Sequence, residues 1–202
     1  MVHVNSDVND DVSTTKRALR TRLQAARSSL SPSTRERADA LLCAHAVTLA
    51  AGQRIAAYAP LPSEPGGPGW LSALAGAAEE LWLPISGADG QLTWACYDGD
   101  APLEPGALGI AEPSGPRRGS EILAELDLIL VPALAVDRRG IRLGKGAGFY
   151  DRALTHAESV RTVAVVFADE VLDLVPGLPH DVPVDAALTP AGVEPLGGIP
   201  GH

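Results

Sequence analysis

The order of hydrophobic and polar positions predicts two helices near the amino terminus. Residues 15–29 carry leucine and alanine side chains at intervals of three and four, which is typical of an amphipathic helix. In the sequence SLSPSTRE, Ser31 is a suitable capping residue and Pro32 suits a first helical turn, so we expect a second helix as far as about Ala50. The polar, acidic residues 1–14 lack this pattern, and we expect a disordered leader there.

Short apolar runs alternate with further helical segments and predict a sheet. The run LDLILVPALAV at residues 126–136 is the most apolar part of the chain, which indicates a central parallel strand. Helices are expected at WLSALAGAAEE and FYDRALTHAES, residues 70–80 and 149–159. The other strands are expected at residues 54–60, 81–85, 92–98, 161–168 and 184–188. This alternation predicts one α/β domain over residues 15–190, with three α/β/α layers around a mostly parallel sheet.

Two segments fall outside this alternation. Residues 98–120 are rich in Gly and Pro, and because so long a loop in a compact domain usually has a function, we expect a lid over a site. The chain after Pro190 is also rich in Gly and Pro, and we expect residues 191–202 to form a loosely ordered tail.

Composition and charge exclude several classes of protein. The 202 residues are 46% hydrophobic, which is enough for one substantial core. A net charge of −9 argues against general binding to nucleic acid. No run of about 18 apolar residues occurs, so neither a membrane span nor a secretion signal is expected. Cys43 and Cys96 have no CxxC spacing, so we expect neither a zinc site nor disulfides, and a cytoplasmic location fits best.

The basic residues are concentrated in two short segments. Five of the sixteen Lys and Arg residues lie in KRALRTRLQAAR, residues 16–27, and five more lie in DRRGIRLGKGAGFYDR, residues 137–152. Such clusters in an acidic protein suit a small polyanion such as a nucleotide, although the first segment is equally typical of a solvated helix face.

Four glycines, Gly140, Gly144, Gly146 and Gly148, lie between the predicted central strand and the next helix. Open α/β sheets bind ligands at this position, where backbone amides and the helix amino terminus face an anion. The spacing matches neither the dinucleotide fingerprint nor the Walker loop. The loop therefore predicts phosphate binding without naming a ligand.

A family resemblance follows from these motifs. The run RLGKGAGFYDR, together with KRALR, GIAEP and HDVPVDAALT, resembles the 5-formyltetrahydrofolate cyclo-ligases over nearly the whole chain. The resemblance implies a single α/β/α unit that uses ATP and Mg²⁺ to convert 5-formyltetrahydrofolate, with or without a polyglutamate tail, into 5,10-methenyltetrahydrofolate, ADP and phosphate. A monomer without nucleic-acid or membrane partners is expected.

The resemblance also assigns residues to roles. Lys145 and Arg142 would stabilise charge on the transferred phosphoryl group, and Asp151 and Asp181 would hold magnesium. Glu64, with Lys145 and Phe149, would contact the folate. The residues implied to bind ATP are Lys16, Arg20, Arg142, Leu143, Gly144, Lys145, Gly146, Ala147, Gly148, Phe149 and Tyr150.

Several alternatives stay open at this point. The chain is also compatible with a nucleotide- or sugar-phosphate-binding module without catalysis, or with a related ATP-dependent enzyme that acts on another small molecule. Asp185 is as compatible with an exposed loop as with the site, whereas His180, a single histidine in a loop, is more typical of a surface residue than of a base. Tyr58, Trp94 and Tyr97 are candidates for stacking on a ring, but aromatic side chains on strands usually belong to the core.

Overall fold

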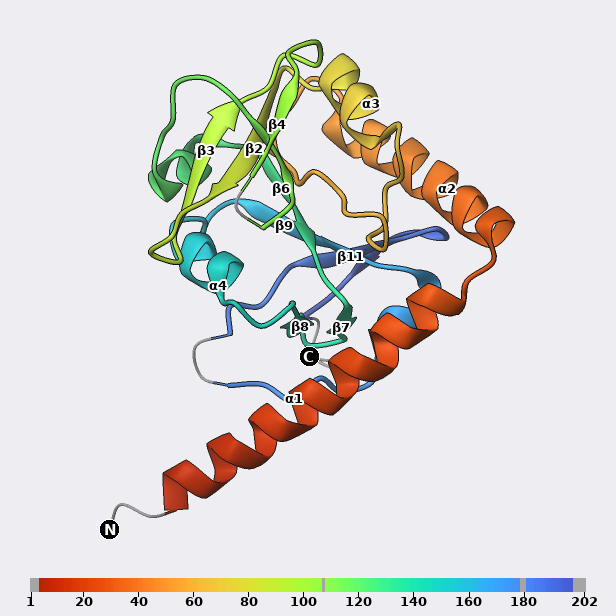
Figure 1. Cartoon of the computed structure of the whole chain (residues 1–202), viewed down its shortest axis with the longest axis vertical. Helices are drawn as coiled ribbons and strands as arrows, with labels where there is room; N and C mark the ends of the chain where they lie inside the picture. Colours follow the sequence, from red (N-terminus) through yellow and green to blue (C-terminus); the bar gives the residue numbers. More distant parts are fainter. Residues whose placement is uncertain (1–3, 107, 179–180, 198–202) are drawn as a thin grey trace, which may run out of the picture.

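A twisted seven-stranded sheet forms the centre of the protein (Figure 1). The computed structural model describes residues 4–106, 108–178 and 181–197. The strand order is β12-β11-β9-β6-β1-β2-β3, and only the edge strands β12 and β3 run antiparallel to their neighbours. The strands are β1 (Arg54–Ala56), β2 (Glu80–Ser86), β3 (Leu92–Cys96), β6 (Leu128–Pro132), β9 (Arg161–Val165), β11 (Ala186–Thr189) and β12 (Gly192–Pro195). The predicted mostly parallel sheet is confirmed.

Helices cover both faces of the sheet. Helices α2 (Pro32–Ala50) and α3 (Trp70–Ala77) lie on one face, while α4 (Phe149–Leu154) and the 3₁₀ helix η1 (Ser120–Glu125) lie on the other. The side chains of β6 alternate between these layers, because successive residues of a strand point to opposite faces. Leu128 and Leu130 pack under α2 and α3, whereas Ile129 and Val131 pack under α4. The three-layer prediction is therefore confirmed.

Both ends of the described chain are more regular than predicted. Helix α1 (Val4–Ser29) begins eleven residues before Thr15, so residues 4–14 are helical and not a disordered leader. The segment contains neither Pro nor Gly, and nothing interrupts the helix that continues from it. At the other end, Gly192–Pro195 forms β12 and pairs with β11, so the predicted loose tail begins with an edge strand. In Figure 1 the amino-terminal turns of α1 extend beyond the rest of the protein.

The predicted central strand at residues 126–136 is divided in two. Strand β6 ends at Pro132, and the chain then enters a separate small sheet with the order β10-β7-β8, made of Val171–Leu172, Ala135–Asp137 and Arg142–Leu143. The buried Asp137 carboxylate holds the turn between β7 and β8 by accepting hydrogen bonds from Arg139 N at 2.9 Å and Ile141 N at 3.1 Å. The glycine loop therefore follows β8, and not the central strand directly.

The predicted loop at residues 98–120 contains regular structure. Strands β4 (Leu103–Pro105) and β5 (Ala111–Pro113) form a hairpin, and η1 begins at Ser120. The carboxylate of Glu112 accepts a hydrogen bond from Ser86 N at 2.9 Å, which fixes the hairpin beside the end of β2. The short helix η2 (Ala168–Glu170) follows β9. Across the described residues, we find no helix with the length and apolar character needed to cross a membrane.

Candidate active site

A cavity of about 370 Å³ lies beyond the carboxyl ends of β1, β2 and β6. All of the site residues predicted from the sequence line it: Lys16, Arg20, Glu64, Arg142, Leu143, Gly144, Lys145, Gly146, Ala147, Gly148, Phe149, Tyr150, Asp151 and Asp181. The carboxyl edge of a parallel sheet is the usual ligand-binding position in an open α/β fold. The structure thus brings the predicted residues together, while their individual roles stay predictions.

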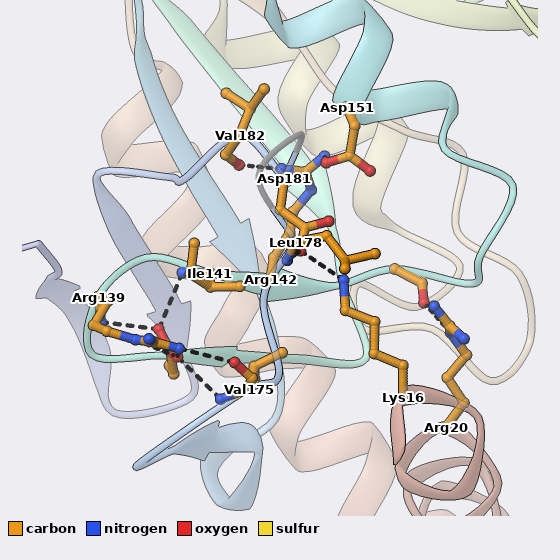
Figure 2. Close-up of polar contacts among 12 residues, drawn as sticks. Lys16, Arg20, Arg139, Ile141, Arg142, Asp151, Val175, Leu178, Asp181 and Val182 are labelled. Carbon is orange, nitrogen blue, oxygen red and sulfur yellow. Dashed lines mark hydrogen bonds and ion pairs between the residues drawn. The ribbon is translucent and has the colours of Figure 1, made fainter. Parts of the chain in front are cut away.

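Helix α1 supplies two cations to the cavity. Its apolar residues Leu19 and Leu23 pack against a small cluster that includes Leu143, and this contact turns the preceding polar positions toward the glycine loop. Lys16 Nζ lies 2.6 Å from the Asp181 carboxylate, and Arg20 Nε donates to the Gly144 carbonyl oxygen at 2.9 Å (Figure 2). The four-residue spacing thus places both cations on one side of the helix, as predicted.

The glycine loop has the backbone conformation that its composition predicts. Gly146 and Gly148 have φ angles of 106° and 71°, in the left-handed region that side chains rarely adopt. A Cβ atom on Gly148 would meet the guanidinium of Arg152 at 2.8 Å. Helix α4 starts directly after Gly148 and ends at Leu154, five residues before the predicted end. This short helix carries Tyr150 and Asp151, and so positions both residues at the cavity.

Arg142 lies between the two aspartates that the sequence assigned to a metal (Figure 2). Its guanidinium contacts Asp151 at 2.7 Å and donates to the Val182 carbonyl oxygen at 2.6 Å. Burial lowers the pKa of Arg142, and the nearby carboxylates of Asp151 and Asp181 oppose that shift. Asp181 also accepts a hydrogen bond from Leu178 N at 2.7 Å. Both carboxylates are therefore paired with cations of the same cavity.

The donor atoms of this region fit magnesium. Asp151 and Asp181 provide carboxylate oxygens, which are the ligands that Mg²⁺ prefers, and the Asp151 side chain is 27% exposed. In the part of the chain that the structure describes, no group of three or more His, Cys, Asp or Glu side chains has metal-binding geometry. Two carboxylates are nevertheless sufficient, because protein-bound Mg²⁺ usually completes its shell with water and phosphate.

Glu64 and Lys145 form an ion pair across the cavity, with 2.8 Å between Oε1 and Nζ. Glu64 lies in the loop after β1, and its other carboxylate oxygen accepts a hydrogen bond from Leu61 N at 2.9 Å. The sequence predicted that both residues contact ligands but did not predict that they contact each other. This ion pair links the loop that contains Glu64, which was assigned to folate, with the glycine loop that contains Lys145, which was assigned to ATP.

Much of the remaining lining of the cavity is apolar. It is formed by Tyr58, Ala59, Pro84, Leu92, Leu108, Ile110, Pro132, Phe149 and Tyr150. Leu108 and Ile110 come from the β4–β5 hairpin region, so part of the predicted lid segment does border the site. The sequence did not single out these two residues, although their place in the long Gly/Pro-rich segment was a signal.

The other candidate residues are placed as follows. Tyr58 lines the cavity and donates its hydroxyl to the Pro65 carbonyl oxygen at 2.7 Å, whereas Trp94 is fully buried in the core and Tyr97 lies outside the cavity. Asp185 accepts hydrogen bonds from Thr162 N at 2.7 Å and its hydroxyl at 2.9 Å, so it joins β9 to β11 and does not line the site. His180 lies outside the described residues.

Arg27 is a further charged residue on the cavity wall that sequence reasoning missed. It lies in the last turn of α1, contacts the Glu170 carboxylate at 2.7 Å and donates to the Ala133 carbonyl oxygen at 2.6 Å. Its guanidinium carbon also lies 5.4 Å from the centre of the Phe167 ring. Arg27 therefore anchors α1 to the segments after β6 and β9.

The hydroxyl of Tyr150 is buried beside the cavity and has no hydrogen-bond partner among the residues that the structure describes. Its ring meets the edge of Trp94, with 6.3 Å between centroids. Burial raises the pKa of Tyr150, and the charge of Glu64 raises it further. A buried hydroxyl without a protein partner carries a desolvation cost that lowers the stability of the folded protein.

Replacement of Tyr150 by phenylalanine is therefore expected to stabilise the protein. Removal of the unpaired hydroxyl should recover about 1 kcal/mol of desolvation free energy, which raises the Tm by about 2–4 °C for a chain of this size. Thermal denaturation followed by circular dichroism measures the change. A Tm below that of the wild type would contradict the prediction, because it would show that the hydroxyl contributes a stabilising contact.

Comparisons with known proteins agree with this geometry. The sequence model of the 5-formyltetrahydrofolate cyclo-ligase family matches residues 12–190. A 5-formyltetrahydrofolate cyclo-ligase of Mycolicibacterium smegmatis is 41% identical over 187 residues, covering 87% of this chain and 93% of the relative. One from Escherichia coli K12 is 32% identical over 121 residues, covering 58% of this chain and 66% of the relative.

Solved structures show the same fold. The NMR structure of 5,10-methenyltetrahydrofolate synthetase from Aquifex aeolicus has a TM-score of 0.78 at 28% identity and covers 93% of this chain and 95% of its own. The corresponding structure from Mycoplasma pneumoniae, at 19% identity and a TM-score of 0.67, shows the likeness of fold alone over 86% of this chain and 97% of its own. From the match of the family's sequence model and the long alignment with the mycobacterial relative, the chain belongs to the 5-formyltetrahydrofolate cyclo-ligase family.

Proposed function

We propose that the protein converts 5-formyltetrahydrofolate into 5,10-methenyltetrahydrofolate with ATP and Mg²⁺, releasing ADP and phosphate. The observation that carries this proposal is that one cavity is lined both by a group of cations and by a set of apolar side chains. We call the lining around Lys16, Arg20 and Arg142 the cationic part of the cavity, and the lining that includes Tyr58 and Phe149 the apolar part. A polyphosphate suits the first part and a flat ring system suits the second.

The cationic part supports ATP binding. Lys16 and Arg20 from α1 and Arg142 from β8 converge on the glycine loop, where backbone amide groups and positive side chains suit phosphate oxygens. Asp151 and Asp181 would hold magnesium beside them, and bound Mg²⁺ would offset phosphate charge. Each aspartate at present contacts a cation through one carboxylate oxygen, Asp151 through Oδ1 and Asp181 through Oδ2, so the other oxygen of each is available to a metal.

The apolar part supports folate binding. Glu64 is an acceptor at its edge, and the ring system of a folate carries N–H groups that can donate to it. Phe149 adds an apolar surface from the start of α4, next to the loop that would bind the phosphates. The formyl group of a folate bound in this way would face the terminal phosphate of ATP, and the protein would promote reaction by holding the two groups together.

The reaction needs no protein nucleophile. The formyl oxygen attacks the terminal phosphorus of ATP, and ADP leaves. The second folate nitrogen then attacks the formyl carbon and releases its proton to solvent, and the C–O bond breaks so that the original formyl oxygen departs with the phosphate. Lys145 and Arg142 would stabilise the negative charge of the transferred group, which is supported by their position on the cavity lining, where Lys145 pairs with Glu64 and Arg142 with Asp151.

The direct test is the ultraviolet absorbance of methenyltetrahydrofolate after purified protein is mixed with 5-formyltetrahydrofolate, ATP and Mg²⁺. We expect the product to form, and to require both ATP and the metal. Samples without ATP, without Mg²⁺, or with chelator serve as controls. Folded protein that binds ATP but forms no product would contradict the proposal and favour a binding module or another substrate.

A further inference from the structure

Among the residues that the structure describes, every carboxylate that lines the cavity forms an ion pair with a cation that also lines it. The three pairs are Lys16–Asp181 at 2.6 Å, Arg142–Asp151 at 2.7 Å and Lys145–Glu64 at 2.8 Å. In each pair, one partner is assigned to phosphate and the other to magnesium or folate. A ligand that takes either member of a pair as a full partner therefore competes with the other member. Of the three, Lys145–Glu64 joins the two parts of the cavity.

The two members of this pair differ in freedom to move. Glu64 is 9% exposed, and its own loop fixes it: Leu61 N donates to its carboxylate at 2.9 Å, and Glu64 N donates to the Leu61 carbonyl oxygen at 2.8 Å. Lys145 is 43% exposed and lies between Gly144 and Gly146 on the glycine loop. Lys145 is therefore the member that swings toward a phosphate, while Glu64 stays in place.

Movement of Lys145 away from Glu64 costs free energy, and a second ligand can offset that cost. Once Lys145 contacts a phosphate, the largely buried Glu64 carboxylate keeps only the Leu61 amide as a donor. A buried charge without its counter-ion is unfavourable. The N–H groups of a bound folate would satisfy Glu64, and Lys145 would then be free for the nucleotide. Each ligand thus removes the cost of binding the other.

We propose that Glu64 is a positioning residue for Lys145 as well as a folate contact, and that exchange of the Lys145–Glu64 pair makes ATP and folate bind with positive cooperativity. This inference rests on the proposed function, because it needs both ligands in the one cavity. By linkage, the factor by which folate tightens nucleotide binding equals the factor by which nucleotide tightens folate binding.

The test is calorimetric titration of the protein with a non-hydrolysable imido analogue of ATP and Mg²⁺, with and without saturating 5-formyltetrahydrofolate. For the wild type we expect the folate to tighten nucleotide binding by about fivefold or more. For Glu64→Gln, which leaves Lys145 without its ion pair, we expect binding of the analogue alone to be tighter than in the wild type by about the same factor. Folate should then have little further effect on the nucleotide Kd.

Two further variants sharpen the experiment. Glu125→Gln removes the same charge from an exposed ion pair with Arg118, outside the cavity, and is expected to retain the wild-type cooperativity. Lys145→Gln changes a half-exposed side chain on a loop, and its folate Kd is expected to be independent of nucleotide. This second variant keeps the test decisive if Glu64→Gln does not fold.

Two results would overturn the inference. The first is that saturating folate leaves the Kd of the wild-type protein for the nucleotide analogue unchanged. The second is that a folded Glu64→Gln variant binds the analogue no more tightly than the wild type does. The absorbance assay on the wild type separates this failure from failure of the proposed function. Product formation without cooperativity removes only the inference, whereas absence of product removes the proposed function itself.

Discussion

Replacement of Lys145 by alanine is expected to lower kcat/KM for 5-formyltetrahydrofolate by about 10²- to 10³-fold, the usual effect of removing one group that stabilises charge in the transition state. Lys145 lies at the boundary between the cationic and apolar parts of the cavity, where the formyl oxygen and the terminal phosphate would meet. Its side chain is half-exposed and has no place in the core, so the fold should be unaffected.

Initial rates of methenyltetrahydrofolate formation measure this loss. Lys145→Arg keeps the positive charge and should recover much of the activity, although a guanidinium has a different shape from an ammonium. Arg138→Ala is the matched control, because it removes a cation from an exposed pair with Glu194, outside the cavity. Retention of more than about a tenth of the wild-type kcat/KM by the alanine variant would show that Lys145 does not stabilise the transferred group.

Replacement of Arg27 by leucine is expected to lower the free energy of unfolding by about 3–5 kcal/mol, because it leaves one member of a buried ion pair without its partner. The Glu170 carboxylate would keep only the hydrogen bond from Phe167 N, at 2.7 Å. The carbonyl oxygen of Ala133 would also lose the donor that now contacts it at 2.6 Å.

Equilibrium unfolding in urea measures this loss of stability. Arg54→Leu breaks an ion pair with Asp127 whose side chains are about two-fifths exposed, and because solvent screens this pair, we expect a much smaller loss of stability than for Arg27→Leu. A double variant that replaces both Arg27 and Glu170 by leucine should be more stable than Arg27→Leu alone, since it leaves no buried unpaired charge. Equal stability of the Arg27 and Arg54 variants would contradict the prediction.

The sequence predicted the layers of the fold well because the strands have clear apolar patterns. The alternating residues of LILV, in the run at 128–131, do face opposite layers. The same pattern could not show that the chain leaves the main sheet at Pro132, because the apolar run continues through residues 133–136. Nor could composition distinguish a polar helix from a disordered leader over residues 4–14.

The candidate site was predicted as a set of residues but not as a set of contacts. Motifs identified Lys16 and Asp181, yet their ion pair joins positions 165 residues apart and depends on how α1 packs. The role of Arg27 could not be predicted for the same reason, since its partner Glu170 lies far along the chain, in the short helix η2 after β9. Single residues of a motif carry chemistry, whereas the pairing among them is a property of the folded chain.

The way in which α1 is attached makes the candidate site sensitive to movement of this helix. The helix is held by Arg27 near its carboxyl end, whereas Lys16 lies eleven residues earlier, about 16 Å along the axis at 1.5 Å per residue. Leu19 and Leu23 pack between these two points, so the helix is attached along this stretch as one rod, with the residues proposed to contact the nucleotide toward its amino-terminal side. A shift of the rod would move Lys16 and Arg20 together, so the proposed nucleotide contacts would be lost before the sheet itself comes apart.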